Sequence, residues 1–188
     1  MPHYKMDRID RWLRSARRNL TTDASKTLVN SAVLSRLDYC NGILTGITLR
    51  QCDRLQAVLN AASRVIYGGS KYSHVTPLLK DKLHWLRFRQ RVVYKLCLLV
   101  YKALHDRAPR YIRNLIKPVA SVGAAQRLRS ASSLMLRKPA VKKKLGERGF
   151  SIAAQDAWNA LPYELKSSPS LNSFKTNLKT HLFRLSYG

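Results

Sequence analysis

The sequence predicts a mainly α-helical fold, with a helical bundle followed by a basic, partly irregular helical C-terminal region that contains at most a short strand pair. Apolar residues recur every three or four positions through most of the 188 residues. These periodic stretches begin and end at residues that are typical of helix ends, namely N-cap residues, Pro and Gly. The chain is 45% hydrophobic, so it can bury a real core.

The first part of the chain predicts three helices. Residues 7–20 place apolar side chains at helical spacing with arginines around the other side, which is typical of a basic amphipathic helix. Thr22 stands where the N-cap of a second helix is expected, and its apolar pattern continues to about residue 38. Residues 50–67 repeat the pattern until Gly68 and Gly69 stop it.

The middle of the chain predicts a further short helix, a long central one and a second short one. Pro77 is expected near the first turn of a helix that runs to about residue 83. Residues 88–105 have a wide apolar stripe, which is typical of the central helix of a bundle. Pro109 can open a short helix through residue 116.

The last part predicts a loop over residues 121–133, a short strand at residues 134–136 and a helix over residues 146–161. Ser170 is expected to cap the last helix. We divide the chain into three predicted segments, 1–69, 70–120 and 121–188.

The net charge of +25 comes from 35 Lys and Arg against 10 Asp and Glu, which is far more than solubility needs. Residues 71–188 hold 24 of the basic and 5 of the acidic side chains. From Arg107 to Arg148 there are 12 basic residues and a single acid, Glu147. This distribution predicts a polyanionic partner, and the alternative is a solvated surface.

Composition and spacing argue against catalysis by this chain. Its ten acids are scattered, whereas two-metal enzymes need clustered carboxylates. Three widely spaced cysteines lack zinc-finger spacing and are expected to be reduced, mostly buried thiols. Cys97 and His105 are two helical turns apart, too far to form a nucleophile and base pair. We therefore expect no cofactor and no metal.

Neither a membrane span nor a signal peptide is expected. The longest apolar run, residues 96–101, is far shorter than the roughly 20 residues that a bilayer requires. The N-terminus lacks the apolar core of a signal peptide. The sequence thus predicts a location in the nucleus or the cytoplasm.

An ordered series of short motifs covers nearly the whole chain. The motifs are Ser35-Arg36-Leu37-Asp38-Tyr39-Cys40-Asn41, residues 55–64, His74-Val75-Thr76-Pro77-Leu78-Leu79, Leu83-His84-Trp85-Leu86, Tyr101-Lys102-Ala103-Leu104-His105, Ala108-Pro109, Leu128-Arg129-Ser130, Gly146-Glu147-Arg148-Gly149-Phe150, Trp158-Asn159-Ala160-Leu161-Pro162 and residues 174–183. In this order they resemble one family, the LINE-type non-LTR retrotransposon reverse transcriptases of the jockey and chicken-repeat kind. Ser63 and the pair Arg87-Phe88 depart from the usual pattern.

The resemblance implies that the chain is similar to the C-terminal part of such an RNA-directed DNA polymerase. Residues up to about 69 would be thumb-like, and the rest would belong to the C-terminal extension. The polymerase carboxylates and the endonuclease would lie upstream. The chain would then be no enzyme on its own, and the palm domain of its parent would be one partner.

On this interpretation the chain binds RNA and DNA through backbone phosphates, without reading bases. The expected phosphate contacts are Arg11, Arg14, Arg17, Arg18, Arg127, Arg129, Arg137, Lys138, Lys142, Lys143, Lys144 and Arg148. Aromatic residues such as Tyr72, Tyr94, Tyr101 and Trp158 could stack on bases, but Trp158 is expected in the core. The alternatives are a protein-interaction or self-association module, or an inert translated relic of a mobile element.

Overall fold

The computed structural model describes residues 15, 17, 19–70, 72–119, 134–139 and 149–188. The fold is mainly helical, which confirms the predicted fold class. Within the described residues the only β pairing is a single antiparallel bridge between Pro118 and Leu136. The predicted helix over residues 7–20 lies mostly outside this range.

The chain divides into two compact units that are discontinuous in sequence. The first comprises Met1–Tyr39, Thr48–Phe88 and Tyr187, and the second comprises Cys40–Ile47, Arg89–Ser186 and Gly188. The predicted division into segments 1–69, 70–120 and 121–188 stays a prediction.

The first unit begins with a helix that changes its winding along its length. Helix α2 (Thr22–Val29) continues into a π-helical turn, η1 (Asn30–Leu34), and then into α3 (Ser35–Asp38). The Thr21 hydroxyl accepts a hydrogen bond from the Ala24 amide at 3.2 Å and caps α2. The N-cap predicted at Thr22 was therefore one residue too late, because Thr22 already has helical backbone geometry.

Helix α4 (Leu49–Tyr67) is the longest element of the first unit and matches the predicted helix to within one residue. A capping box between Thr48 and Gln51 begins it, and Gly68, with a φ of 67°, ends it. Helix α2 and the π-helical turn η3 (Leu78–Lys82) pack on α4. A buried cluster in the core of the unit consists of Val29, Ala62, Val65 and Ile66.

The second unit is built on the long helix α5 (Phe88–Leu104), as the apolar stripe predicts. A short 3-10 turn, η2 (Asn41–Leu44), and the short helix α6 (Arg110–Leu115) complete its first part. Leu96, Cys97, Val100 and Tyr101 of α5 are buried. Helix α5 therefore supplies the central surface on which the later helices of the unit pack.

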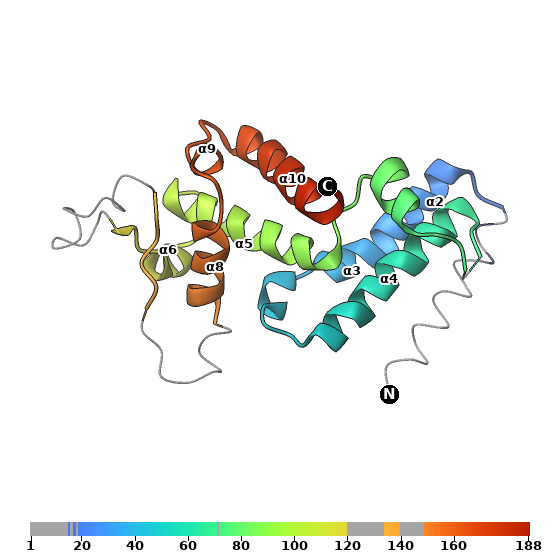
Figure 1. Ribbon diagram of the computed structural model, residues 1–188, viewed down its shortest axis with the longest axis horizontal. Coiled ribbons are helices and arrows are strands. Elements are labelled where there is room, and N and C mark those ends of the chain that lie inside the picture. Colours follow the sequence, from blue (N-terminus) through green and yellow to red (C-terminus); the bar gives the residue numbers. More distant parts are fainter. Residues whose placement is uncertain (1–14, 16, 18, 71, 120–133, 140–148) are drawn as a thin grey trace. The chain divides into compact units, whose positions relative to one another are not determined.

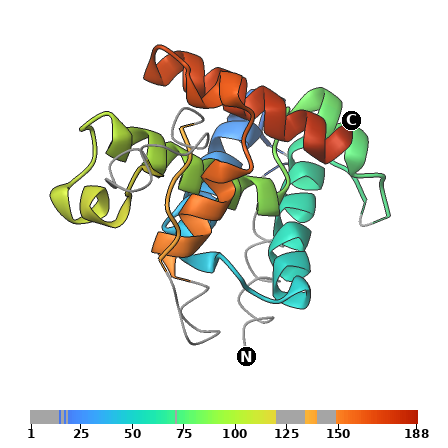
Figure 2. The ribbon, with the colours of Figure 1, turned by 60° about the vertical axis from the view of Figure 1, so that its left-hand side comes forward.

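Helices α8 (Phe150–Asn159), α9 (Tyr163–Lys166) and α10 (Leu171–Tyr187) follow, and the sequence did not predict α9. Figure 1 shows α8 and α10 beside α5, and the turned view agrees (Figure 2). The Ser170 hydroxyl caps α10 as predicted, accepting from the Ser173 amide at 3.1 Å. Phe174 of α10 contacts both Tyr101 and Trp158.

The cap of α2 is testable. We expect Thr21→Ala to lower the free energy of unfolding by about 1 kcal/mol, because one amide of the first turn loses its acceptor. Thr22→Ala is the matched control and should have little effect, since this residue lies inside the helix. Denaturant unfolding followed by circular dichroism measures both values. A larger loss in Thr22→Ala than in Thr21→Ala would place the cap at Thr22.

Candidate nucleic-acid interface

The structure describes three of the twelve predicted phosphate contacts, namely Arg17, Arg137 and Lys138. The other nine lie outside the described residues: Arg11, Arg14, Arg18, Arg127, Arg129, Lys142, Lys143, Lys144 and Arg148. Arg17 belongs to the first unit, and Arg137 and Lys138 belong to the second. Among the three described contacts, Arg137 and Lys138 thus lie together.

Arg17 ties the N-terminal segment to the end of α4. Its Nε donates to the Ile66 carbonyl at 2.9 Å, and its Nη1 donates to the Leu20 carbonyl at 2.8 Å. The last carbonyls of a helix lack partners within the helix and lie at the negative end of its dipole. Arg17 therefore satisfies an acceptor of α4, and its contact with phosphate stays a prediction.

Lys138 and Arg137 are both exposed but differ in their partners. The Lys138 ammonium forms an ion pair with Asp156 of α8. An exposed pair of this kind is worth little in stability and can exchange for another anion. Arg137 forms no ion pair with any described residue.

The antiparallel bridge places Arg137 directly opposite a second cation, Lys117. The Arg137 amide donates to the Lys117 carbonyl at 2.9 Å, on one side of the bridge between Pro118 and Leu136. Side chains directly opposite in an antiparallel pair share a face, with Cβ atoms about 5 Å apart, and like charges there repel. Lys117 is also exposed and has no ion pair within the described residues. An anion between the two cations would relieve this repulsion.

The segment 134–138 is fixed on α8 by two consecutive side chains. The Trp158 indole Nε1 donates to the Leu134 carbonyl at 2.9 Å. The Asn159 side chain accepts from the Leu136 amide and donates to the Leu136 carbonyl, both at 2.9 Å. These bonds place the bridge, and with it Arg137, although the segment has little secondary structure of its own.

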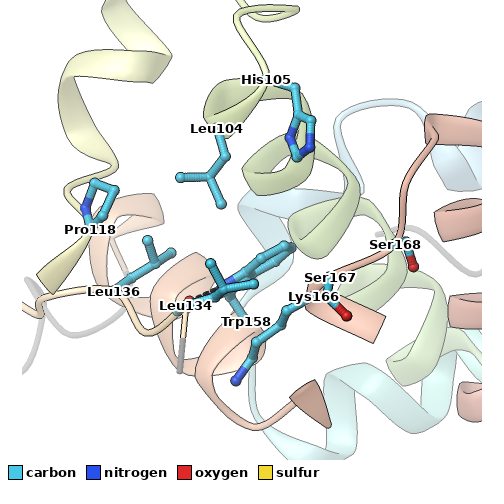
Figure 3. Close-up of a pocket in the computed structure, with 9 residues that line it drawn as sticks. All are labelled: Leu104, His105, Pro118, Leu134, Leu136, Trp158, Lys166, Ser167 and Ser168. Atoms are coloured by element: carbon cyan, nitrogen blue, oxygen red, sulfur yellow. Dashed lines mark hydrogen bonds between the residues drawn. The ribbon is translucent and has the colours of Figure 1, made fainter. Parts of the chain in front are cut away.

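The other face of the bridge lines a cavity of about 320 Å³ within the second unit. Its walls are largely apolar and include Leu104, Leu134 and Leu136, whose side chains converge in Figure 3. The ring of His105 is directed into the same space from the end of α5. Because successive residues of an extended segment point to opposite faces, Lys117 and Arg137 lie on the outer face.

Lys166 is a buried cation at the edge of this cavity. Its ammonium donates to the Asn159 carbonyl at 3.1 Å and lies 3.5 Å from the Met135 sulfur. Burial lowers the pKa of Lys166, and the nearby Cys97 thiol opposes that shift. No carboxylate pairs with Lys166 among the described residues.

The cysteines differ from one another in exposure. Cys97 is fully buried, as predicted, whereas Cys40 is exposed and Cys52 is half-buried, so the prediction of mostly buried thiols was wrong for Cys40. Burial raises the pKa of Cys97 to about 12, and Lys166 opposes the rise. A thiol with such a pKa is almost entirely protonated near neutral pH and is a poor nucleophile.

Among the described residues, the structure forms no cluster of three or more His, Cys, Asp or Glu side chains that could hold a metal ion. Tyr101 and Trp158 are buried and cannot reach a base, whereas Tyr72 is exposed. Sequence reasoning missed Lys117 and His105. Only the register of the bridge brings Lys117 opposite Arg137, and no local pattern encodes a register between irregular segments.

No protein-family model, curated protein or solved structure matches the chain. Within the described residues, each helix is too short or too polar to cross a bilayer.

The attachment of segment 134–138 to α8 is testable through Asn159. We expect Asn159→Ala to speed hydrogen exchange at the Leu136 amide, because this amide loses its acceptor. Unfolding should become easier by about 1–3 kcal/mol, since the Leu136 carbonyl also loses its donor. Asn172→Ala, at an exposed position of α10, is the control. Equal exchange rates in the two variants would contradict the role of Asn159.

The burial of Cys97 predicts a pH dependence. Near pH 8 a thiol reagent should modify Cys40 in the folded protein and Cys97 only after unfolding, as measured by mass spectrometry of peptides.

The stability of the protein should also depend on the Cys97 thiol at high pH. Its folded-state pKa is raised from the ordinary 9.0 to about 12, so the contribution of the Cys97 thiol to stability is present below pH 9 and is lost as the pH rises toward 12. The stability difference between the wild type and Cys97→Ala should follow this course. A difference that grows with pH would contradict it.

Proposed function

We propose that the chain binds nucleic acid through backbone phosphates. The observation that supports this most directly is the pair of exposed cations, Lys117 and Arg137, held opposite each other by the bridge without an acidic partner among the described residues. Folding places two like charges together here, which costs stability unless an anion binds between them. A phosphate group has the charge and the acceptor oxygens for both cations.

The charge of the second unit also supports a polyanionic ligand. Its sequence has 20 basic residues against 4 acidic ones, so it is far more positive than the first unit, which has 15 against 6. Two of those four acids, Asp106 and Asp156, already form ion pairs with Arg113 and Lys138. Most cations of this unit are therefore left without an acid, and a duplex or a strand supplies phosphates at regular spacing.

We further propose that the chain is derived from the C-terminal part of a LINE-type retrotransposon reverse transcriptase. The support is the ordered series of sequence motifs from residue 35 to residue 183, together with the predicted helical fold. On this proposal the chain acts as a nucleic-acid grip in the nucleus or the cytoplasm. Catalysis would belong to the palm of the parent polymerase.

A second candidate function, a protein-interaction or self-association module, has one observation in its favour. Tyr39 and Leu49, both of the first unit, are 80% and 74% exposed. Large apolar side chains that form an exposed patch can mark a surface that a partner covers. Binding through such residues would depend little on salt, so a salt series separates the two functions.

The experiment is binding of the full chain to a labelled RNA hairpin and to a primer–template duplex across a salt series. We expect the logarithm of the association constant to fall linearly with the logarithm of the salt concentration. The slope should correspond to the neutralisation of several phosphates. The double variant Lys117→Glu with Arg137→Glu should flatten that slope by about 2 and weaken binding at least about tenfold. Fluorescence anisotropy measures both quantities.

The control is Arg50→Glu with Arg54→Glu, two exposed positions of α4 in the first unit. It changes the net charge by the same amount, so it accounts for nonspecific attraction. If the two double variants reduce the salt slope by the same amount, Lys117 and Arg137 have no special role in binding. If the folded wild type fails to bind at low salt, the proposed function is wrong and the interaction module becomes the better account.

A further inference from the structure

A continuous column of aromatic rings leads from the core of the second unit to the surface. The Tyr101 ring stacks on Phe174 of α10, with centroids 4.3 Å apart and planes at 17°. On its other side the His105 ring stacks on Tyr101, at 4.0 Å and 14°. Phe174 and Tyr101 are buried, whereas His105 is exposed. The column therefore ends in an exposed planar ring.

Hydrogen bonds hold the outer two rings of this column in place. The Tyr101 hydroxyl donates to the Ser168 carbonyl at 2.9 Å in a buried position. The His105 Nδ1 lies 3.0 Å from the Tyr101 carbonyl, which can only accept, so this nitrogen has the proton. The exposed imidazole is thus fixed before any ligand arrives, and a stacking partner would pay little of the usual entropy cost of ordering a side chain.

The cavity beside His105 suits a flat, largely apolar group. Its volume of about 320 Å³ lies at the small end of the range for ligand pockets, which fits a single planar ring system. Leu104 and Leu134 supply apolar walls, and Ser167 lines the cavity as a polar residue (Figure 3), whereas the Lys166 ammonium is directed toward Met135 and Asn159. A nucleobase combines a flat face with polar edges and matches this lining.

The segments that line the cavity also hold the cations described above. Pro118 and Leu136 face the cavity, and their chain neighbours Lys117 and Arg137 face outward. Arg107, two residues after His105, is exposed as well. Phosphates bound outside would therefore lie near a cavity that can take an unstacked base of the same strand.

We propose that His105 is a stacking platform for one unpaired base of the bound strand, inserted into the cavity between Leu104 and Leu134. This inference rests on the proposed function, because the phosphates of the strand bring the base to the cavity. It differs from backbone binding in a measurable way. The affinity of phosphate contacts does not depend on whether the strand has bases, whereas stacking on His105 requires a base.

The experiment compares two single-stranded oligonucleotides of equal length and phosphate number, one with adenine at every position and one abasic throughout. We expect the folded wild type to bind the adenine strand about tenfold more tightly, which is the usual size of one base stacked on an aromatic side chain. Both strands should give the same salt slope. His105→Ala should remove the preference for adenine and leave the slope unchanged.

Two further variants test the role of the ring itself. His105→Tyr keeps a planar ring and should retain the preference for adenine. Loss of that preference in a folded His105→Tyr would show that the imidazole nitrogens, and not stacking on the ring, bind the base, and would overturn the stacking platform. His74→Ala removes another exposed histidine, in the first unit, and should behave as the wild type. A strand with one 2-aminopurine gives an independent readout, because stacking on the ring at position 105 should quench its fluorescence in the wild type, in His105→Tyr and in His74→Ala, but not in His105→Ala.

The outcomes separate this inference from the proposed function. Equal binding of both strands by the wild type, with a steep salt slope, would overturn the stacking platform and leave phosphate binding intact. An adenine preference that survives in His105→Ala would place the base elsewhere and also overturn it. No binding of either strand by a folded sample would refute the proposed function, and the inference with it. His105 is exposed, so loss of folding in His105→Ala is not expected.

Discussion

The placement of segment 134–138 in the second unit depends on one hydrogen bond, which the Trp158 indole donates to the Leu134 carbonyl. Trp158 packs against Phe174 of α10, so it belongs to the core, and its indole N–H reaches from that core to an irregular segment. Asn159, the next residue, adds two bonds to Leu136. The buried helix α8 thereby fixes a segment that forms only one isolated bridge, and this attachment places both the bridge and the cavity wall beside it.

Much of the helical fold was predictable because helices leave local signals. The apolar spacing in α4 and α5, Gly68 at the end of α4 and Ser170 at the start of α10 each act within a few residues. The N-cap of α2 was misplaced because Thr21 and Thr22 are chemically equivalent caps, and only backbone geometry separates them. Helix α9 is too short to show a period, and the π-helical turns arise within periodic stretches that predict ordinary helix.

The sequence predicted an excess of basic residues in the second half of the chain, but it did not predict which of them form the candidate site. The sequence indicated which cations are abundant, but the pairing of Lys117 with Arg137 depends on the register of two irregular segments. His105 attracted attention only for its distance from Cys97, whereas its stack on Tyr101 gives it a different environment. Conversely, Tyr101 is an aromatic residue that the sequence suggested for base stacking, but it is buried and so cannot contact a base. Long-range contacts decide each of these points, and local sequence patterns do not encode them.

The backbone at Leu134 has a consequence for how this sequence can change over generations. Leu134 has a φ of 55°, a left-handed conformation that costs a branched side chain about 1–2 kcal/mol. Glycine or asparagine there would relax the backbone and keep the carbonyl that accepts from Trp158, although either would remove an apolar wall of the cavity. Trp158 has no such freedom, because any replacement loses both the packing and the indole donor. We therefore expect substitutions at Leu134, which contributes only a backbone acceptor to this hydrogen bond, to preserve the fold more often than substitutions at Trp158, which contributes the side-chain donor.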